Sequence, residues 1–131
     1  MAMGQQEVIG LTITLPAGGT IAKGKLVKLS SGSVVVTTAI TDCALGVALQ
    51  SVTSGQACPV QITGIALCVN GSAGITVDAE VMPAAATSTG EVDSAAGATG
   101  RSIGVALATV AAGEYVPVLL ALPAAKRPPL T

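Results

Sequence analysis

The stretch LGVALQSVTSGQACPVQITGIA, residues 45–66, decides the fold because a close copy of it, IGVALATVAAGEYVPVLLALPA, stands at residues 103–124. Both copies have Gly-Val-Ala-Leu after an aliphatic residue, continue through a turn that contains glycine, and end in a segment that contains Pro-Val. Neither copy offers a set of catalytic side chains. The repeat therefore indicates a duplicated structural unit.

The similarity extends towards the N-terminal side of each copy. AKGKLV at 22–27 aligns with VDAEVM at 77–82, and SSGSV at 30–34 aligns with STGEV at 88–92. The second copy has extra residues in the segment PAAATSTG, where a surface turn tolerates an insertion.

The segments of each unit are typical of β-strands. β-branched residues dominate them, glycines separate them at short intervals, and no segment shows a sustained apolar period of 3.6 residues. Pro59 and Pro117 stand at matching places, and because proline cannot donate to a sheet ladder, we expect both at edges or bulges. Gly46 and Gly104 precede Val-Ala-Leu in both copies and indicate a bulge or a close backbone approach. The sequence thus predicts an all-β fold, a small β-barrel or sandwich built from two internally duplicated β-units.

The predicted organisation is one β domain with an extended arm at each end. The domain covers residues 11–122, and its repeat units cover about 19–66 and 73–124. Residues 1–10 form the N-terminal arm. Residues 123–131 form the C-terminal tail, which contains two adjacent prolines and reads as an extended segment.

The composition favours a protein whose surface is covered by other subunits. Half of the 131 residues are hydrophobic. Only 10% are charged, whereas about a quarter of the residues are charged in typical soluble domains. A surface so poor in charge indicates an oligomer or a lattice component, although a well-packed monomer remains the alternative. With a net charge of −1 and one aromatic residue, the chain has no basic stripe or stacking platform for nucleic acid. Its longest apolar run is about half of the roughly 20 residues that span a bilayer, so we expect no membrane partner.

Several kinds of chemistry are disfavoured by the residues present. The chain has no histidine, and Cys43, Cys58 and Cys68 lack metal-ligand spacing, so we predict buried thiols in a reducing compartment and no metal. GGTIAKGKL resembles a phosphate-binding loop, but Leu26 stands where a Ser or Thr is required and a hairpin pattern follows in place of a helix. The carboxylate pairs at 78/80 and 91/93 fit solvated strand faces. We predict no enzymatic activity and no cofactor.

One feature of the charges suggests an interface. Lys23 and Lys25 align with Asp78 and Glu80 in the second copy, so matching places carry opposite charges. Across a symmetric contact, this inversion gives electrostatic complementarity. The tail adds two basic residues that we also predict to contact a partner, Lys126 and Arg127.

The segments AKGKLVKLSSGSV, DCALGVALQSVTSGQACPVQITG and RSIGVALATVAAGEYVPVLL resemble the small capsid decoration, or cement, proteins of tailed bacteriophages. The resemblance covers most of residues 19–122. It implies a homotrimer on the outer surface of an expanded icosahedral head, made in the host cytoplasm and bridging subunits of the major capsid protein. It carries no catalytic residues, and it leaves open which arm contacts the capsid.

Two other functions remain open at the level of sequence. A phage tail or baseplate β-module has a similar composition, but it usually carries longer polar or aromatic receptor-binding loops. A small-ligand-binding β-barrel requires a cavity with a few converging polar groups, and no polar cluster marks one here.

Overall fold

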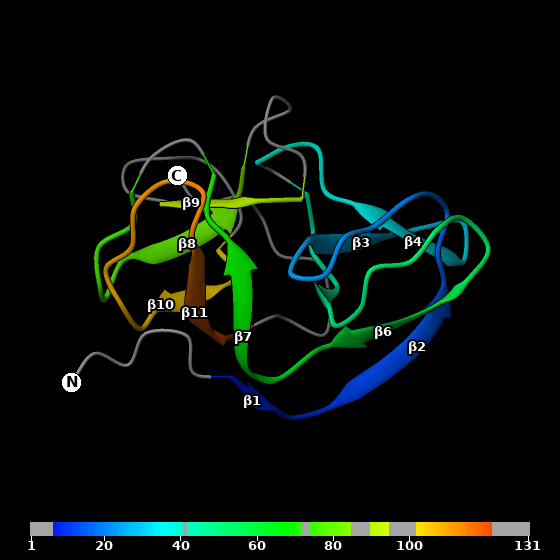
Figure 1. Cartoon of the computed structure of the whole chain (residues 1–131), viewed down its shortest axis with the longest axis horizontal. Coiled ribbons are helices and arrows are strands. Elements are labelled where there is room, and N and C mark those ends of the chain that lie inside the picture. Colours follow the sequence, from blue (N-terminus) through cyan, green and yellow to red (C-terminus); the bar gives the residue numbers. More distant parts are fainter. Residues whose placement is uncertain (1–6, 41, 72–73, 85–89, 95–101, 122–131) are drawn as a thin grey trace.

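The computed structural model describes residues 7–40, 42–71, 74–84, 90–94 and 102–121. Throughout these residues the regular structure is β-strand, with no helix, and the strands form two sheets that lie side by side (Figure 1). The predicted all-β fold class is confirmed.

The smaller sheet is built by residues 12–61, which we call the N-terminal unit. Its five strands lie in the order β2 (Thr12–Pro16), β6 (Ala57–Gln61), β5 (Gly46–Ala48), β3 (Leu26–Ser30), β4 (Ser33–Val36).

The larger sheet is built mainly by residues 64–120, which we call the C-terminal unit. Its strands lie in the order β7 (Gly64–Val69), β11 (Tyr115–Leu120), β10 (Gly104–Ala106), β8 (Glu80–Pro83), β9 (Val92–Ser94), and β1 (Val8–Ile9) is added outside β7.

The two units have the same connectivity. When β2 to β6 are matched in chain order with β7 to β11, the two sheets have an identical strand order, with all paired strands antiparallel. Equivalent loops also make equivalent bonds: the N–H of Leu49 donates to the carbonyl of Pro59, and that of Leu107 to Pro117. The repeat in the sequence is therefore a repeat of the fold.

The unit boundaries differ from the predicted ones. Residues 64–66 were placed at the end of the first unit, but they begin β7, which pairs with β11 and β1. The segment 45–66 therefore crosses from one sheet to the other, because its Pro-Val strand, β6, is the last strand of the N-terminal unit and β7 is the first strand of the C-terminal unit.

The register shifts one part of the sequence alignment by a residue. Val27 pairs with Gly46, and Val81 pairs with the equivalent Gly104, so Val27 corresponds to Val81. The backbone agrees, because Gly24 (φ 86°) and Asp78 (φ 75°) share the left-handed conformation. The alignment of AKGKLV with VDAEVM is therefore wrong by one position, and Lys23 and Lys25 are not equivalent to Asp78 and Glu80.

The two prolines occupy equivalent but internal strands. Pro59 is in β6, between β2 and β5, and Pro117 is in β11, between β7 and β10, so the predicted edge position is wrong. The strands tolerate proline because β5 and β10 are short. Pro59 and Pro117 lie opposite Leu49 and Leu107, just beyond the ends of β5 and β10. There each proline only accepts a hydrogen bond, because its carbonyl binds the N–H of the leucine and no proline N–H is required.

Gly46 and Gly104 show the predicted close approach of backbones. A Cβ on Gly46 would collide with the carbonyl of Gln61, and one on Gly104 with the carbonyl of Leu119. Only glycine allows these strands to pair at this distance.

The N-terminal end is partly ordered into the sheets. Val8 and Ile9 of β1 pair with Ile65 and Gly64, and β2 continues alongside β6, so one extended segment joins both sheets (Figure 1). The predicted arm at 1–10 is therefore too long, because these backbone groups are hydrogen-bonded within the sheet. Residues 1–6 and the predicted tail at 123–131 lie outside the described residues.

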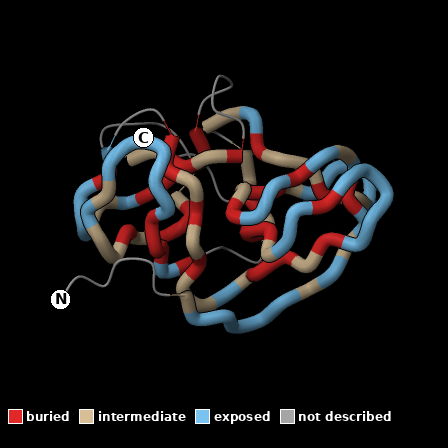
Figure 2. The backbone as a smooth tube through the Cα atoms, viewed as in Figure 1, coloured by how far each residue is buried: buried red, intermediate tan, exposed pale blue. Residues whose placement is uncertain are grey.

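Buried side chains form two clusters (Figure 2). One lies within the N-terminal unit and contains Val27, Ala48 and Val60. The other fills the C-terminal unit and also takes in Leu26 and Val47 from the N-terminal sheet. Because Leu26 and Val27 are adjacent and both fully buried, the N-terminal sheet is covered on both faces at this strand.

Cys58 and Cys68 are buried thiols, as predicted, one in each cluster. Burial disfavours the thiolate, and it raises the pKa of Cys68 to about 12 and also raises that of Cys58. Cys43 is partly buried.

Candidate interaction surfaces

The predicted interface residues lie at different places on the two units. Lys23, Asp78 and Glu80 are exposed, and Lys25 is half-buried. Lys126 and Arg127 fall outside the described residues. Asp78 and Glu80 occupy the places that Gly24 and Leu26 have in the first unit, where both residues are buried.

Lys25 lies at the contact between the units. Its Nζ is 3.2 Å from Oε2 of Glu91 in the C-terminal unit. Beside this pair, the N–H of Leu26 donates to the carbonyl of Gly90 at 2.7 Å, and the N–H of Gly90 donates to the carbonyl of Thr37 at 2.8 Å. The loop before β9 is thereby hydrogen-bonded to the N-terminal sheet.

A second contact joins β7 to the segment before β3. The N–H of Val69 donates to the carbonyl of Gly24 at 3.3 Å, next to the ring of Tyr115. A Cβ on Gly24 would lie 2.7 Å from Cε1 of Tyr115, so this close approach requires glycine. The internal contact is therefore specific in both hydrogen bonding and shape.

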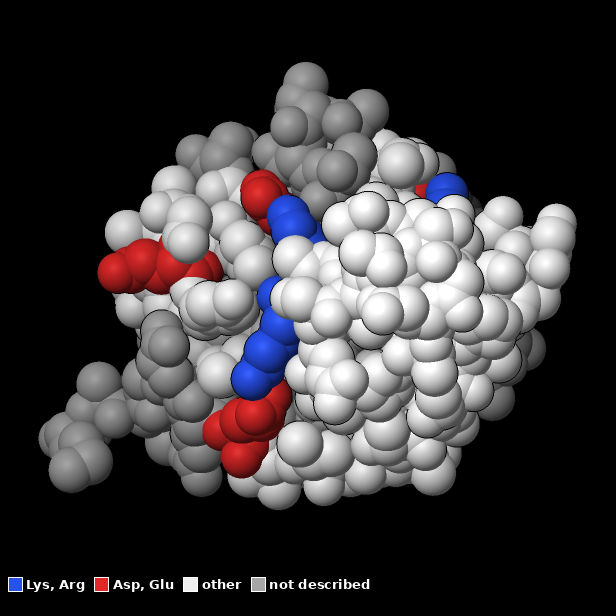
Figure 3. Space-filling view, turned by 45° about the vertical axis from the view of Figure 1, so that its right-hand side comes forward, with Lys and Arg blue, Asp and Glu red and all other residues white. Residues whose placement is uncertain are grey.

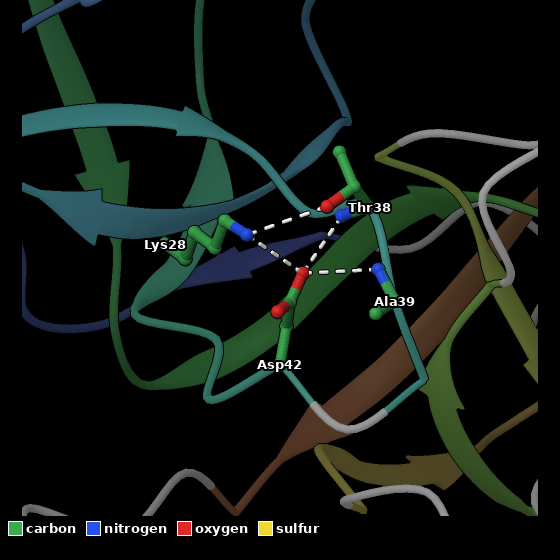
Figure 4. A network of polar contacts seen from close by, with 4 residues as sticks. All are labelled: Lys28, Thr38, Ala39 and Asp42. Carbon is green, nitrogen blue, oxygen red and sulfur yellow. Dashed lines mark hydrogen bonds and ion pairs between the residues drawn. The ribbon is translucent and has the colours of Figure 1, made fainter.

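Lys28 and Asp42 form a polar network at the end of the β3–β4 hairpin (Figure 4). Oδ2 of Asp42 accepts from Nζ of Lys28 at 3.1 Å and from the N–H groups of Thr38 and Ala39 at 2.7 and 3.0 Å. Burial alone raises the pKa of Asp42, but these hydrogen bonds and the lysine charge outweigh it and lower that pKa. The network fixes the loop that follows β4.

One row of side chains crosses the face of the N-terminal sheet that is turned towards the C-terminal unit. Cross-strand pairing places Thr12, Gln61, Val47 and Leu26 in line on β2, β6, β5 and β3. The last three are at most 1% exposed, because the C-terminal unit covers them. Nε2 of Gln61 donates to the carbonyls of Val8, Thr63 and Ile65, where β1 meets β7.

The equivalent row on the C-terminal sheet is open. It consists of Ile65, Leu119, Val105 and Glu80 on β7, β11, β10 and β8, and β1 extends it with Val8. Val8 and Leu119 are each 48% exposed, Ile65 and Val105 are half-buried, and Glu80 is exposed. We call this row the outer apolar face. It is the surface that the sequence reasoning missed, although the aliphatic residues that alternate in GIALCV and YVPVLL gave a signal.

Charge is sparse and unevenly distributed. Between Asp42 and Asp78 the sequence has no charged residue. In Figure 3 the charged side chains lie at the left, in the middle and at the upper right of the view, and a broad uncharged area occupies the lower right. Such a surface suits contact with other proteins better than contact with a polyanion.

Two kinds of feature are absent from the described residues. No group of three or more Cys, Asp or Glu residues is arranged there to hold a metal ion, and no helix there has the length and hydrophobicity of a membrane span.

The family model described as phage cement protein matches residues 5–122. The chain belongs to the phage cement protein family. Among curated proteins, no relative matches it. Cement proteins are structural, non-enzymatic components of the phage capsid, so this cement protein has a structural role in stabilising the capsid. The resemblance noted from the repeated segments is confirmed.

Proposed function

We propose that this cement protein decorates the outer surface of an icosahedral phage head as a homotrimer, and that each trimer bridges neighbouring major capsid protein subunits. The observation that carries the proposal is the family match over nearly the whole described fold. The all-β scaffold supports it, because the scaffold offers surfaces and no catalytic constellation among the described residues.

The physical role of such a bridge follows from linkage. A ligand that binds only the closed lattice lowers the free energy of that state. Many weak copies suffice when each contacts several sites, because the second contact is made at high effective concentration. The charge-poor surface fits a protein that shares much of its area with other subunits.

The ends of the chain are the proposed reach to the capsid. The tail from residue 124 carries Lys126, Arg127 and two prolines, and a proline-rich arm loses less entropy on binding than a glycine-rich one. The N-terminal candidate is residues 1–6, because Val8 is already paired in the sheet.

Co-sedimentation with undecorated heads tests the proposal. The full chain is expected to pellet with heads, and cryo-electron microscopy of these heads is expected to show density at three-fold and quasi-three-fold positions. Deletion of 124–131, or separately of 1–6, should leave the β fold intact while at least one deletion weakens binding. No association of the full chain with heads contradicts the proposal, and full binding by both truncated chains moves the capsid contact to the strands.

A further inference from the structure

The outer apolar face is an uncovered surface whose counterpart in the same chain is covered. In the N-terminal unit the row that contains Gln61, Val47 and Leu26 is buried beneath the C-terminal unit. In the C-terminal unit the equivalent row keeps Leu119 48% exposed. Because the two sheets have the same strand order, the two rows have equivalent backbone positions, and a surface like the one that covers the first row is the candidate to cover the second.

The covering surface also has a counterpart in the chain. In the C-terminal unit, the residues that contact the N-terminal sheet at residues 24–26 include Val69 at the end of β7, Gly90 before β9 and Tyr115 at the start of β11. The equivalent residues of the N-terminal unit are Pro16, Gly32 and Ala57. All three are exposed.

The two glycines show the difference most clearly. A Cβ on Gly90 would lie 2.9 Å from Cδ of Lys25 in the other unit, whereas a Cβ on Gly32 meets no atom within 4 Å. Both glycines have the same left-handed conformation, with φ of 75° and 84°. The turn at Gly32 is therefore built like the covering turn but contacts nothing at this point among the residues that the structure describes.

The internal contact is thus head-to-tail, because the covered row of one unit meets the covering surface of the other. The outer apolar face and the surface formed by Pro16, Gly32 and Ala57 take no part in this contact. A contact of this type, repeated between molecules, gives a closed ring when the rotation closes. We propose that the Pro16–Gly32–Ala57 surface of a second copy of this chain covers the outer apolar face. Three chains then form a ring of six similar units. This inference rests on the proposed trimer and names its interface.

The contact between copies cannot repeat the polar bonds of the internal one. Pro16 has no N–H, so it cannot repeat the bond from Val69 to Gly24. Ala79 stands where the first unit has Lys25, and Ser33 stands where the second has Glu91, so the ion pair is also not repeated. What remains is apolar packing around Leu119 and Val105, to which Asp78 and Glu80 add two carboxylates at the places of the buried Gly24 and Leu26. Because the ion pair of the internal contact is not repeated, we expect an association that salt hardly weakens.

Cross-linking between engineered cysteines tests the geometry. Gly24 lies against Tyr115 inside the chain, so the equivalent Asp78 of one copy should lie against Ala57 of the next. The variant Asp78→Cys with Ala57→Cys, in a Cys43→Ser background, is treated with a short bismaleimide, free and on heads. We expect a covalent trimer as the largest product, whereas each single cysteine variant gives no product larger than a dimer.

Charge substitution tests the energetics, with a matched control. Leu119→Lys places a charge in the proposed contact and should weaken self-association by about tenfold or more in light scattering. Leu29 is 56% exposed but lies on the opposite side of the N-terminal sheet from Leu26, so Leu29→Lys should assemble like the unmodified chain. Both variants should melt cooperatively.

The outcomes separate this interface from the proposed function. A trimer that persists in Leu119→Lys, with no cross-link between positions 57 and 78, overturns the interface while the trimer stands. A ladder of products beyond three chains overturns the closed ring. A full chain that neither trimerises nor binds heads overturns the proposed function, and the interface with it.

Discussion

Gln61 and Leu119 occupy the same position in two sheets of the same strand order, yet the glutamine is fully buried and the leucine is 48% exposed. Hydrophobicity alone predicts the reverse. Gln61 is stable inside because Nε2 donates to carbonyls at the crossing of β1 and β7, and Leu119 is outside because nothing in the described chain covers its face. The comparison teaches that position in the tertiary structure, and not local sequence, decides which face of a duplicated sheet is interior.

The largest change in stability is expected when Leu26 is replaced by Glu, the residue that the second unit has at the equivalent position 80. Leu26→Glu copies Glu80 into a fully buried site, where an unpaired carboxylate is strongly disfavoured. We expect a loss of about 3 kcal/mol or more in the free energy of unfolding, measured by urea denaturation.

The reverse exchange is the control for position 26. Glu80→Leu is at an exposed site and should change the stability by about 0.5 kcal/mol or less. Equal effects of the two exchanges would show that the outer faces do not differ in burial.

A smaller loss is expected from Gln61→Leu, which makes the first row resemble the second. The variant leaves the carbonyls of Val8, Thr63 and Ile65 without their side-chain donor, at a cost of about 1–3 kcal/mol. Oε1 of Gln61 has no hydrogen-bond partner, so its removal offsets part of this cost. Leu119→Gln should leave the unfolding free energy nearly unchanged, and amide hydrogen exchange at Val8 and Ile9 should rise only in Gln61→Leu.

Asp42→Asn should remove about 1 kcal/mol at neutral pH, because it weakens a charge-assisted network. In the second unit Met82 stands in the place of Lys28, so the lysine of this network is not repeated. The folded pKa of Asp42 lies below its ordinary value of 3.8. The stabilisation is therefore complete above pH 3.8 and is lost as the pH falls through the folded pKa. Thermal melts from pH 7 to pH 2 should show the two proteins converging at the acidic end, and a constant difference would contradict the assignment.

The smallest effect is expected from Lys25→Met, which breaks the ion pair between the units. Side chains of Lys25 and Glu91 are 22% and 26% exposed, so the pair is partly screened and contributes about 0.5 kcal/mol. The difference from the unmodified protein should shrink further in 1 M salt. A loss comparable to that of Leu26→Glu would mean that charge, and not apolar burial, holds the units together.

Much of the fold was predictable from local patterns. The repeated Gly-Val-Ala-Leu phrase, the spacing of glycines and the β-branched segments predicted two all-β units, and the structure has them. The close backbone approach at Gly46 and Gly104 was also predictable, because a glycine kept in the same place in both units marks a position where a Cβ does not fit.

Other predictions failed because they depend on strand partners. Pro59 and Pro117 were expected at edges, but the short β5 and β10 leave room for proline in an inner strand. The opposite charges of Lys23, Lys25, Asp78 and Glu80 seemed to match in the sequence, and the register of β8 against β10 moved them apart by one position. A shift of one residue exchanges the two faces of a strand, which sequence alignment of short segments does not resolve.

The sequence by itself determined that this chain is a duplicated β protein of the cement family and that few of its residues are charged. Those properties reside in residue types and their spacing. Only the tertiary structure decided that Leu26, Val47 and Gln61 are interior while Val8, Val105 and Leu119 are not fully covered. The physical reason is that both rows are chemically able to be buried, and burial requires a second surface that approaches in space. The described part of the chain supplies such a surface once, with Val69, Gly90 and Tyr115 at the contact, and leaves the second row partly exposed.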